Sequence, residues 1–430
     1  MLRDQPNLNG TVIDSLPAGT RVEIVKTDQG GNYPFGSEIR NDWKQITVGG
    51  QNGFVAGAYV TSVSSPPVFS NNKEIRGVWI CSHYNSDVLK SSTSITNALD
   101  FLQLNGFNTI FPAVWNQGFT AFPSEVMERN GFPKQDPEYI NFDPVKEIVE
   151  QGKRRGMAVV PWFEYGFAAS LSLDGGHILQ LKPKWSAIDS SKNKARHGDL
   201  TWMNSLNLEV QQLMLDLVIE IIQKYDVDGI QGDDRFPAMP FNAGYDNETV
   251  SEFNNKYGTN PPINGKDPDW IRFRSDKLTQ FLEKLYKEVK RVKPTCSVFM
   301  APAVFPFSLE NLMQDTNNWM KHGLVDFLNP QIYRTSFDGY KAEVDKIKDN
   351  TVASQRLKYV PGIAFTANKK DLTPNDIVQC VKYNRQNGLG GQSFFYYEGL
   401  IRNNNEIVIA LVSQNDYNQI ASLPSSITIT

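Results

Sequence analysis

Hydrophobic and polar residues follow two different patterns along the 430-residue chain, and the pattern changes near residue 74. Before this point, short apolar runs alternate with polar residues and no helical period fits between them. Alternation with a period of two predicts half-buried β-strands. We therefore predict a small all-β domain over residues 1–63. Its strands are expected at 21–25, 43–48 and 53–55, and its turns at Gly19-Thr20, Gly30-Gly31 and Gly49-Gly50.

From residue 74 onward, eight apolar strand-like runs alternate with amphipathic stretches. The runs lie at 75–82, 108–115, 158–165, 227–233, 297–304, 325–333, 359–365 and 392–397. The clearest helical patterns lie at 206–225, 270–293 and 374–387. Strands joined by helices must pair in parallel, and eight such units predict an α/β domain, a (β/α)8 TIM barrel, over residues 74–420. A doubly wound open sheet is the alternative.

The two domains are joined by a segment rich in serine, proline and asparagine. It begins Ser64-Ser65-Pro66-Pro67 and continues to about residue 73. Proline-rich segments of this kind act as semi-rigid spacers. We therefore expect a linker over residues 64–73.

Composition narrows the possible functions. The 43 Lys and Arg residues are balanced by 47 Asp and Glu residues, giving a net charge of -4, which argues against nucleic-acid binding. No apolar run approaches the roughly 20 residues of a membrane-spanning helix. The four histidines form no metal-binding motif and the three cysteines no pair, so we expect neither a metal nor a cofactor. Aromatic residues make up 11% of the chain, which favours sugar binding.

Candidate chemistry gathers where the predicted strands end. In a TIM barrel the reacting groups sit at the carboxyl ends of the strands. Four carboxyl groups fall there: Glu164, Asp233, Asp234 and Glu398. Cleavage of a glycosidic bond needs one protonated carboxyl and one ionised carboxylate, and crowded carboxylates move each other's pKa values apart. These four residues are therefore the predicted catalytic groups, with Asp234 and Glu164 leading, Asp233 orienting or sharing the proton, and Glu398 in reserve.

Aromatic and polar side chains near the same strand ends are predicted to bind the substrate. Tryptophan and tyrosine rings can stack on sugar rings, and amide or guanidinium groups can bind hydroxyls or a carboxylated substituent. The predicted set is Trp79, His83, Trp115, Asn116, Trp162, Trp202, Asn204, Arg235, Gln331 and Tyr333.

Several of these residues also have a purely structural interpretation. An Asp-Asp pair at a strand end often caps a helix or pairs with a neighbouring arginine, and adjacent strand residues point to opposite faces. A single tryptophan is more often packing than a sugar platform, and His83 could equally make a structural hydrogen bond. Cys81 lacks the His–Asn partners of a nucleophile, so we interpret it as a small buried residue.

The N-terminal domain resembles a bacterial SH3 domain. The resemblance rests on residues 2–7, residues 12–20, Trp43 and Gly53-Phe54-Val55. The family usually has one more strand before the Leu2-Arg3 segment. We therefore expect that the chain starts inside a longer protein whose export signal has been cut away, and that the protein is periplasmic, associated with the cell wall or secreted.

The larger domain resembles the bacterial glycosyl-hydrolase-like family 10. The matching segments are residues 74–79, 106–109, 202–205, 225–234 and 325–333, of which Asp228-Gly229-Ile230 with Asp233-Asp234 is the most specific. The chain departs from the family at Ser205, at Arg235 and at 161–164. The resemblance implies a barrel that hydrolyses glycosidic bonds, with a polysaccharide of the bacterial cell wall, peptidoglycan, as the favoured substrate.

Three functions follow from these observations. The first is a glycoside hydrolase that acts on peptidoglycan, to which SH3 modules of this kind commonly bind. The second is a non-catalytic protein that binds cell-wall glycan. The third is a metal-assisted hydrolase that uses Asp233, Asp234 and Glu164 as oxygen ligands.

Overall fold

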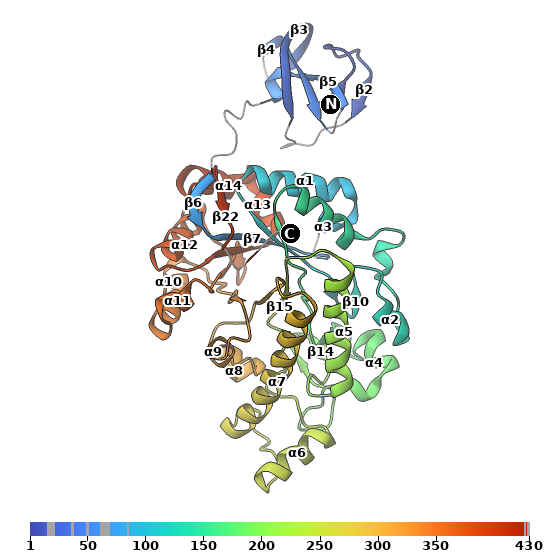
Figure 1. The fold of residues 1–430 in the computed structure, drawn as a ribbon, viewed down its shortest axis with the longest axis vertical. Helices are drawn as coiled ribbons and strands as arrows, with labels where there is room; N and C mark the ends of the chain where they lie inside the picture. Colours follow the sequence, from blue (N-terminus) through green and yellow to red (C-terminus); the bar gives the residue numbers. More distant parts are fainter. Residues whose placement is uncertain are drawn as a thin grey trace.

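The computed structural model describes residues 1–14, 22–35, 38–48, 51–60, 69–83, 86–424 and 427. Figure 1 shows a small β lobe, in blue, next to a larger body in which helices surround strands. The predicted turns at Gly19-Thr20 and Gly49-Gly50 and the linker residues 64–68 lie outside the described residues.

The small lobe is a five-stranded antiparallel sheet with the order β2-β1-β5-β4-β3. Its strands are β1 (Leu2–Arg3), β2 (Val12–Asp14), β3 (Glu23–Phe35), β4 (Glu38–Val48) and β5 (Gln51–Ala56). Leu2, Ile46 and Val55 form its buried core. The expected all-β domain is therefore present in the described residues.

The expected turn at Gly30-Gly31 is wrong. Both glycines lie inside β3, where the register with β4 shifts. A Cβ on Gly30 would lie 1.9 Å from the carbonyl oxygen of Pro6, and the Gly31 amide donates to that same oxygen at 2.7 Å. The glycine pair permits this close approach of two backbones rather than a change of chain direction.

The segment expected to be a linker up to residue 73 contains a strand. Strand β6 (Phe69–Lys73) pairs in parallel with β22 (Ile420–Ser422), near the other end of the chain. Residues 69–73 therefore belong to the larger body.

Apart from β6 and β22, the described residues of the larger body contain eight parallel strands that follow each other along the chain. They are β7 (Ile75–Ile80), β8 (Thr109–Pro112), β11 (Ala158–Val159), β15 (Gly229–Gly232), β16 (Ser297–Met300), β17 (Phe327–Leu328), β18 (Gly362–Ala364) and β21 (Gly391–Phe395). They form one sheet of order β11-β8-β7-β21-β18 and one of order β15-β16-β17. Single parallel bridges join the two sheets at both seams: Trp162 with Gln231, and Leu328 with Tyr359 and Gln331 with Gly362.

These strands are shorter than the predicted runs, and proline is a main reason. Pro161, Pro302 and Pro330 lie just beyond β11, β16 and β17. Proline has no N–H group to donate to a ladder, so regular pairing stops close to it. The chain therefore continues as loops at the carboxyl ends of the strands, where the candidate site lies.

Helices follow the strands and cover the outside of the body (Figure 1). The main ones are α1 (Ser92–Leu104), α3 (Pro144–Arg154), α5 (Leu208–Lys224), α7 (Pro268–Val292), α9 (Thr316–Lys321), α10 (Phe337–Asn350), α12 (Pro374–Gln386) and α14 (Glu406–Gln414). The three clearest predicted helices are confirmed as α5, α7 and α12. Each begins at a side chain that accepts from the first turn, Asn207, Asp267 and Thr373. Among the described helices, none is long and apolar enough to cross a bilayer.

Shorter elements lie between the main ones. They are β9 (Trp115–Asn116), β10 (Phe119–Thr120), α2 (Glu125–Arg129), β12 (Ala168–Ser170), α4 (Gly176–Leu181), β13 (Arg196–His197), β14 (Leu200–Trp202), α6 (Asn247–Tyr257), α8 (Phe307–Leu312), α11 (Ala353–Arg356), β19 (Thr366–Ala367), β20 (Lys370–Asp371) and α13 (Tyr397–Ile401).

Alternate residues of the parallel strands pack into two different clusters. Ile75, Trp79 and Phe111 belong to one that combines strand residues with residues just beyond the strand ends, such as Cys81 and Ala113. Val78, Ile80 and Ile110 belong to a larger one that includes the helices. This is the pattern of strands buried on both faces, with one row of side chains facing the helices and the other facing the opposite strands.

Candidate active site

A pocket of about 350 Å³ opens where the parallel strands end. Its lining combines three carboxyl groups, one arginine, one amide and five aromatic rings. These residues are Trp79, Trp162, Glu164, Asp233, Asp234, Arg235, Gln331, Tyr333, Phe395 and Tyr396. The pocket is therefore concave, aromatic and acidic at once.

Asp233 and Asp234 both line the pocket because the strand has already ended. Strand β15 stops at Gly232, and Asp233 and Phe236 then exchange two backbone hydrogen bonds of 3.0 and 3.1 Å. The resulting tight turn breaks the alternation of a strand, which would have sent the two side chains to opposite faces.

Asp233 is fully buried and held on both carboxylate oxygens. The Arg235 guanidinium donates to its Oδ2, and the Gln331 side-chain amide donates to its Oδ1 at 2.6 Å. Burial raises the pKa of Asp233 well above its usual range, and the neighbouring Asp234 raises it further, whereas Arg235 lowers it. Three fixed donors leave Asp233 little freedom to move.

Asp234 is the more accessible of the two aspartates. Its side chain is 31% exposed, and its Oδ1 lies 3.3 Å from Nε of Arg235. Arg235 therefore stands between the two carboxylates and also donates to the Glu164 carbonyl oxygen at 2.8 Å. Because a guanidinium already occupies the position between these carboxylates, they are poor candidates to hold a metal ion together.

Glu164 is buried but lightly partnered. Its Oε2 accepts one hydrogen bond of 2.7 Å from the Asn116 amide. Burial raises the pKa of Glu164 to about 7, against the lowering effects of Arg235 and Asn116. At neutral pH a substantial fraction of this carboxyl therefore keeps its proton, which is the property that a general acid needs.

Aromatic rings form the walls of the pocket. The ring centroids of Trp79 and Trp162 are 6.3 Å apart, and Tyr333 stacks on Phe395 at 5.3 Å. Trp79 is fixed by a 2.7 Å hydrogen bond from its indole nitrogen to the Gln231 side chain. Burial raises the pKa of Tyr333 well above its usual range, so its hydroxyl stays protonated and can donate to a ligand.

Three residues predicted to bind the substrate do not line the pocket. Trp115 is buried and donates from its indole to the Gly166 carbonyl, and Trp202 likewise donates to His197. Asn204 donates to Asp246 and accepts from the Leu206 amide. The two tryptophans are packing residues, the interpretation that the sequence also allowed for them, and Asn204 holds the loop before α5.

Three further predicted residues are absent from the lining of the pocket. Asn116 donates a hydrogen bond to the Glu164 carboxyl and does not itself line the pocket. Glu398, in the first turn of α13, is partly buried, and burial raises its pKa. His83 turns toward Asp136 and Glu138 instead. Burial also raises the pKa of the Cys81 thiol well above its usual range, which fits the interpretation of Cys81 as a small buried residue.

Sequence reasoning missed Phe395, Tyr396 and Gln231. Phe395 ends the last parallel strand and Tyr396 follows it, so their position at a strand end was a usable signal. Gln231 lies inside β15, and its role depends on reaching Trp79 across the strands, which sequence spacing does not reveal.

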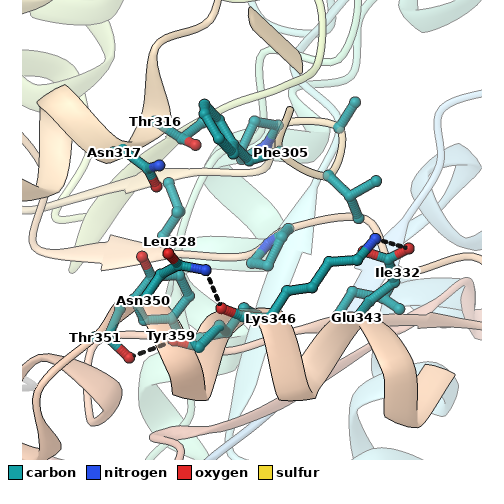
Figure 2. Close-up of a pocket in the computed structure, with 15 residues that line it drawn as sticks. Phe305, Thr316, Asn317, Leu328, Ile332, Glu343, Lys346, Asn350, Thr351 and Tyr359 are labelled. Carbon is teal, nitrogen blue, oxygen red and sulfur yellow. Dashed lines mark hydrogen bonds and ion pairs between the residues drawn. The ribbon is translucent and has the colours of Figure 1, made fainter. Parts of the chain in front are cut away.

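A second, smaller cavity of about 60 Å³ lies under α10 (Figure 2). Leu328, Ile332 and Tyr359 contribute apolar walls. The carboxylate of Glu343 at its edge is already paired with Lys346 and with Arg334. This cavity offers no pair of carboxyl groups facing each other.

Comparisons with known proteins match both parts of the chain. The profile of the family "Glycosyl hydrolase-like 10" matches residues 74–375, and that of "Bacterial SH3 domain" matches residues 2–61. "Glycosyl hydrolase DigH" of Escherichia coli K12 is 26% identical over 348 residues, which span 70% of this chain and 76% of that protein.

Solved structures with a similar fold include glycoside hydrolases. The PgaB glycoside hydrolase domain of Bordetella bronchiseptica aligns with a TM-score of 0.60 at 14% identity, over 82% of this chain and 100% of that one. A β-galactosidase of Rahnella sp. R3 aligns with a TM-score of 0.57 at 13% identity, over 82% of this chain and 57% of that one. The body thus shares the fold of glycoside hydrolase TIM barrels, and the chain belongs to the glycosyl hydrolase-like 10 family, with a bacterial SH3 domain at its N-terminus.

Proposed function

We propose that this chain is a glycoside hydrolase whose eight parallel strands close into a (β/α)8 barrel. The parallel bridges at both seams between the two sheets support closure. The observation that carries the function is the pairing, in one aromatic pocket, of a buried carboxyl with a raised pKa, Glu164, and an accessible carboxylate, Asp234.

In this proposal Glu164 is the general acid. It donates its proton to the glycosidic oxygen as the bond to the anomeric carbon breaks, and the sugar departs as an alcohol. Asp234, beside Arg235, either attacks the anomeric carbon or takes a proton from the attacking water. Asp233 helps to position Asp234 and Glu164 because it fixes Arg235. Arg235 in turn contacts the Asp234 carboxylate and the Glu164 backbone carbonyl.

The walls of the pocket suit a polysaccharide. Trp79, Trp162 and Tyr333 give the pocket an aromatic lining, in which the two tryptophans are almost wholly buried, and Gln331 and the Tyr333 hydroxyl can bind ring hydroxyls or the lactyl carboxylate of a muramic residue. We assign Arg235 mainly to holding the carboxylates, because its guanidinium is already engaged by Asp233.

We propose the glycan of bacterial peptidoglycan as the substrate. The bacterial SH3 domain supports this choice, because a module that binds the cell wall would raise the local concentration of the substrate for a barrel joined to it. A wall substrate lies outside the cytoplasmic membrane, so we propose that the protein is exported.

The test is digestion of purified peptidoglycan, both intact and stripped of its stem peptides, followed by mass analysis of the soluble products. Wild type is compared with Asp234→Asn and Glu164→Gln, and with Glu150→Gln on the surface of α3 as a matched control. Release of disaccharides or muropeptides by wild type and by the control, but not by the two pocket variants, is expected.

Two outcomes would contradict the proposal. Retention of activity within about tenfold in both pocket variants would remove Asp234 and Glu164 from the reaction. Wild-type protein that sediments with the wall but releases nothing from either substrate would favour the alternative, a glycan-binding protein.

A further inference from the structure

A second group of potential ligands lies outside the pocket lining. His83 follows β7, and Asp136 and Glu138 belong to the insertion after β8, around the short 3-10 helix Pro137–Tyr139. One ligand atom from each residue lies within 4.8 Å of the other two. Nε2 of His83 is 3.8 Å from Oδ2 of Asp136 and 3.8 Å from Oε2 of Glu138.

These separations are too long for hydrogen bonds but suit a shared ion. Two ligand atoms that each lie about 2.1 Å from one metal ion can be up to about 4.2 Å apart. Both 3.8 Å separations fall within this limit. The remaining separation, between Asp136 and Glu138, is within 4.8 Å, and the Glu138 side chain is 37% exposed, so it has room to adjust.

The other atoms of the three residues are already engaged, which leaves the facing atoms for a ligand. Oδ1 of Asp136 accepts from the Glu138 amide at 2.9 Å, and Oε1 of Glu138 lies 3.2 Å from the Lys90 ammonium. Nδ1 of His83 lies 2.9 Å from the Ser82 hydroxyl. When Nδ1 carries the proton and donates to Ser82, Nε2 presents its lone pair to the two carboxylates, which is the way protein histidines are prepared for metal binding.

The local charge also favours a cation. Lys90 is shared between Glu138 and Asp87, so the formal charges of Asp87, Asp136, Glu138 and Lys90 sum to -2 beside the His83 imidazole. A divalent ion would neutralise this charge. Mg²⁺ and Ca²⁺ prefer oxygen ligands throughout, whereas an imidazole nitrogen suits Zn²⁺ and similar transition-metal ions.

We propose that His83, Asp136 and Glu138 bind one divalent transition-metal ion of the zinc class, which fastens the loop after β7 to the insertion after β8. The two segments already touch, because the Tyr139 hydroxyl donates to the Ser82 carbonyl at 3.3 Å. His83 also contacts Ser86, whose amide donates to the His83 carbonyl at 3.3 Å and whose side chain helps to lower the pKa of Glu398. The ion would therefore fix a loop that borders the candidate active site.

The test is isothermal titration calorimetry of the full chain, free of any histidine tag, with ZnCl₂ and separately with MgCl₂. Wild type is compared with His83→Gln and Glu138→Gln, and with His322→Gln, an exposed histidine outside the cluster, as a matched control. We expect wild type and the control to bind one Zn²⁺ per chain, and each cluster variant to bind at least about 10 to 100 times more weakly. Mg²⁺ should bind far more weakly than Zn²⁺.

Thermal melting is a second measurement, which distinguishes loss of the metal site from misfolding of a variant. Saturating Zn²⁺ should raise the melting temperature of wild type by about 2 °C or more, but not that of Glu138→Gln, which alters a partly exposed side chain. Absence of Zn²⁺ binding to wild type, or equal binding by wild type and both cluster variants, would overturn the proposal. Neither readout requires hydrolysis, so failure here leaves the proposed glycosidase activity untouched, and failure of that activity leaves the metal site untouched.

Discussion

Two buried carboxyl groups near opposite ends of the parallel strands have opposite pKa shifts. Glu74, directly before β7, is 4% exposed, and Glu164, beyond β11, is 2% exposed. Glu74 is bound by two arginines, Arg76 and Arg385, through hydrogen bonds of 2.6 to 2.9 Å. Burial raises the pKa of Glu74, but the two arginines outweigh burial and hold it below its usual value.

Glu164 has no such pair of arginines. Arg235 donates to its backbone carbonyl while its guanidinium serves Asp233, and one amide contacts the carboxyl itself. Burial therefore dominates and the pKa rises to about 7. Similar burial thus yields a carboxylate with a lowered pKa in one place and a carboxyl with a raised pKa in the other, and the cationic partners decide which.

The largest expected effect is on catalysis. In the proposed mechanism Asp234→Asn removes the ionised carboxylate, so kcat/KM for glycan hydrolysis should fall by about 10,000-fold, which corresponds to about 5 kcal/mol of barrier. Steady-state kinetics on stripped glycan strands would measure it. The free energy of unfolding should change little, because Asp234 is partly exposed.

The next effect is on stability at the other end of the strands. Glu74→Gln leaves the buried guanidinium of Arg76 and that of Arg385 without a carboxylate, so the free energy of unfolding should fall by about 3–5 kcal/mol. Urea denaturation at neutral pH would measure this. A loss below about 1 kcal/mol would show that the two arginines do not need this carboxylate.

A third expected effect is on the pH dependence of stability. The folded-state pKa of Glu164, about 7, lies above its ordinary value of 4.5, so between these values the unfolded chain releases a proton that the folded chain keeps. Wild type should therefore lose about 3 kcal/mol relative to Glu164→Gln as the pH rises from 4.5 to above 7. Urea denaturation of both proteins across this range would test it, and parallel pH curves would contradict it.

The smallest expected effect concerns the hydrogen bond from the Asn116 side-chain amide to the Glu164 carboxyl. The Asn116 hydrogen bond lowers the pKa of Glu164, so Asn116→Ala should raise it. The fall in kcat/KM at high pH, which reports loss of the acid's proton, should move upward by about one pH unit. Trp115→Phe, which changes the neighbouring buried residue without touching Glu164, is the control. If the pH at which kcat/KM falls stays the same or moves downward, Asn116 does not lower the pKa of Glu164.

The sequence predicted the pattern of the fold better than its boundaries. The α/β alternation, the helices α5, α7 and α12, and the gathering of Glu164, Asp233 and Asp234 followed from periodicity and from the rule that parallel strands end at one edge. The strand β6 was missed because its partner, β22, lies about 350 residues away, a contact that no local pattern records.

The sequence also did not predict the direction in which individual side chains point. Trp115 and Trp162 both follow strands and look alike in the sequence, yet only Trp162 of the two lines the pocket. The difference arises from the hairpin of β9 and β10, which turns Trp115 toward the Gly166 carbonyl. Strand alternation would have pointed Asp234 away from Asp233 and out of the pocket. The turn after Gly232 instead brings Asp234 into the pocket lining.

The central claim is that Glu164 carries a proton near neutrality while Glu74 does not. Infrared difference spectra of wild type minus Glu164→Gln, and of wild type minus Glu74→Gln, measure this directly at about pH 5.5 and about pH 8.5. We predict a protonated-acid band for Glu164 at the lower pH that is replaced by carboxylate bands at the higher pH, and carboxylate bands for Glu74 at both. Carboxylate bands for Glu164 already at the lower pH would contradict its role as the proton donor.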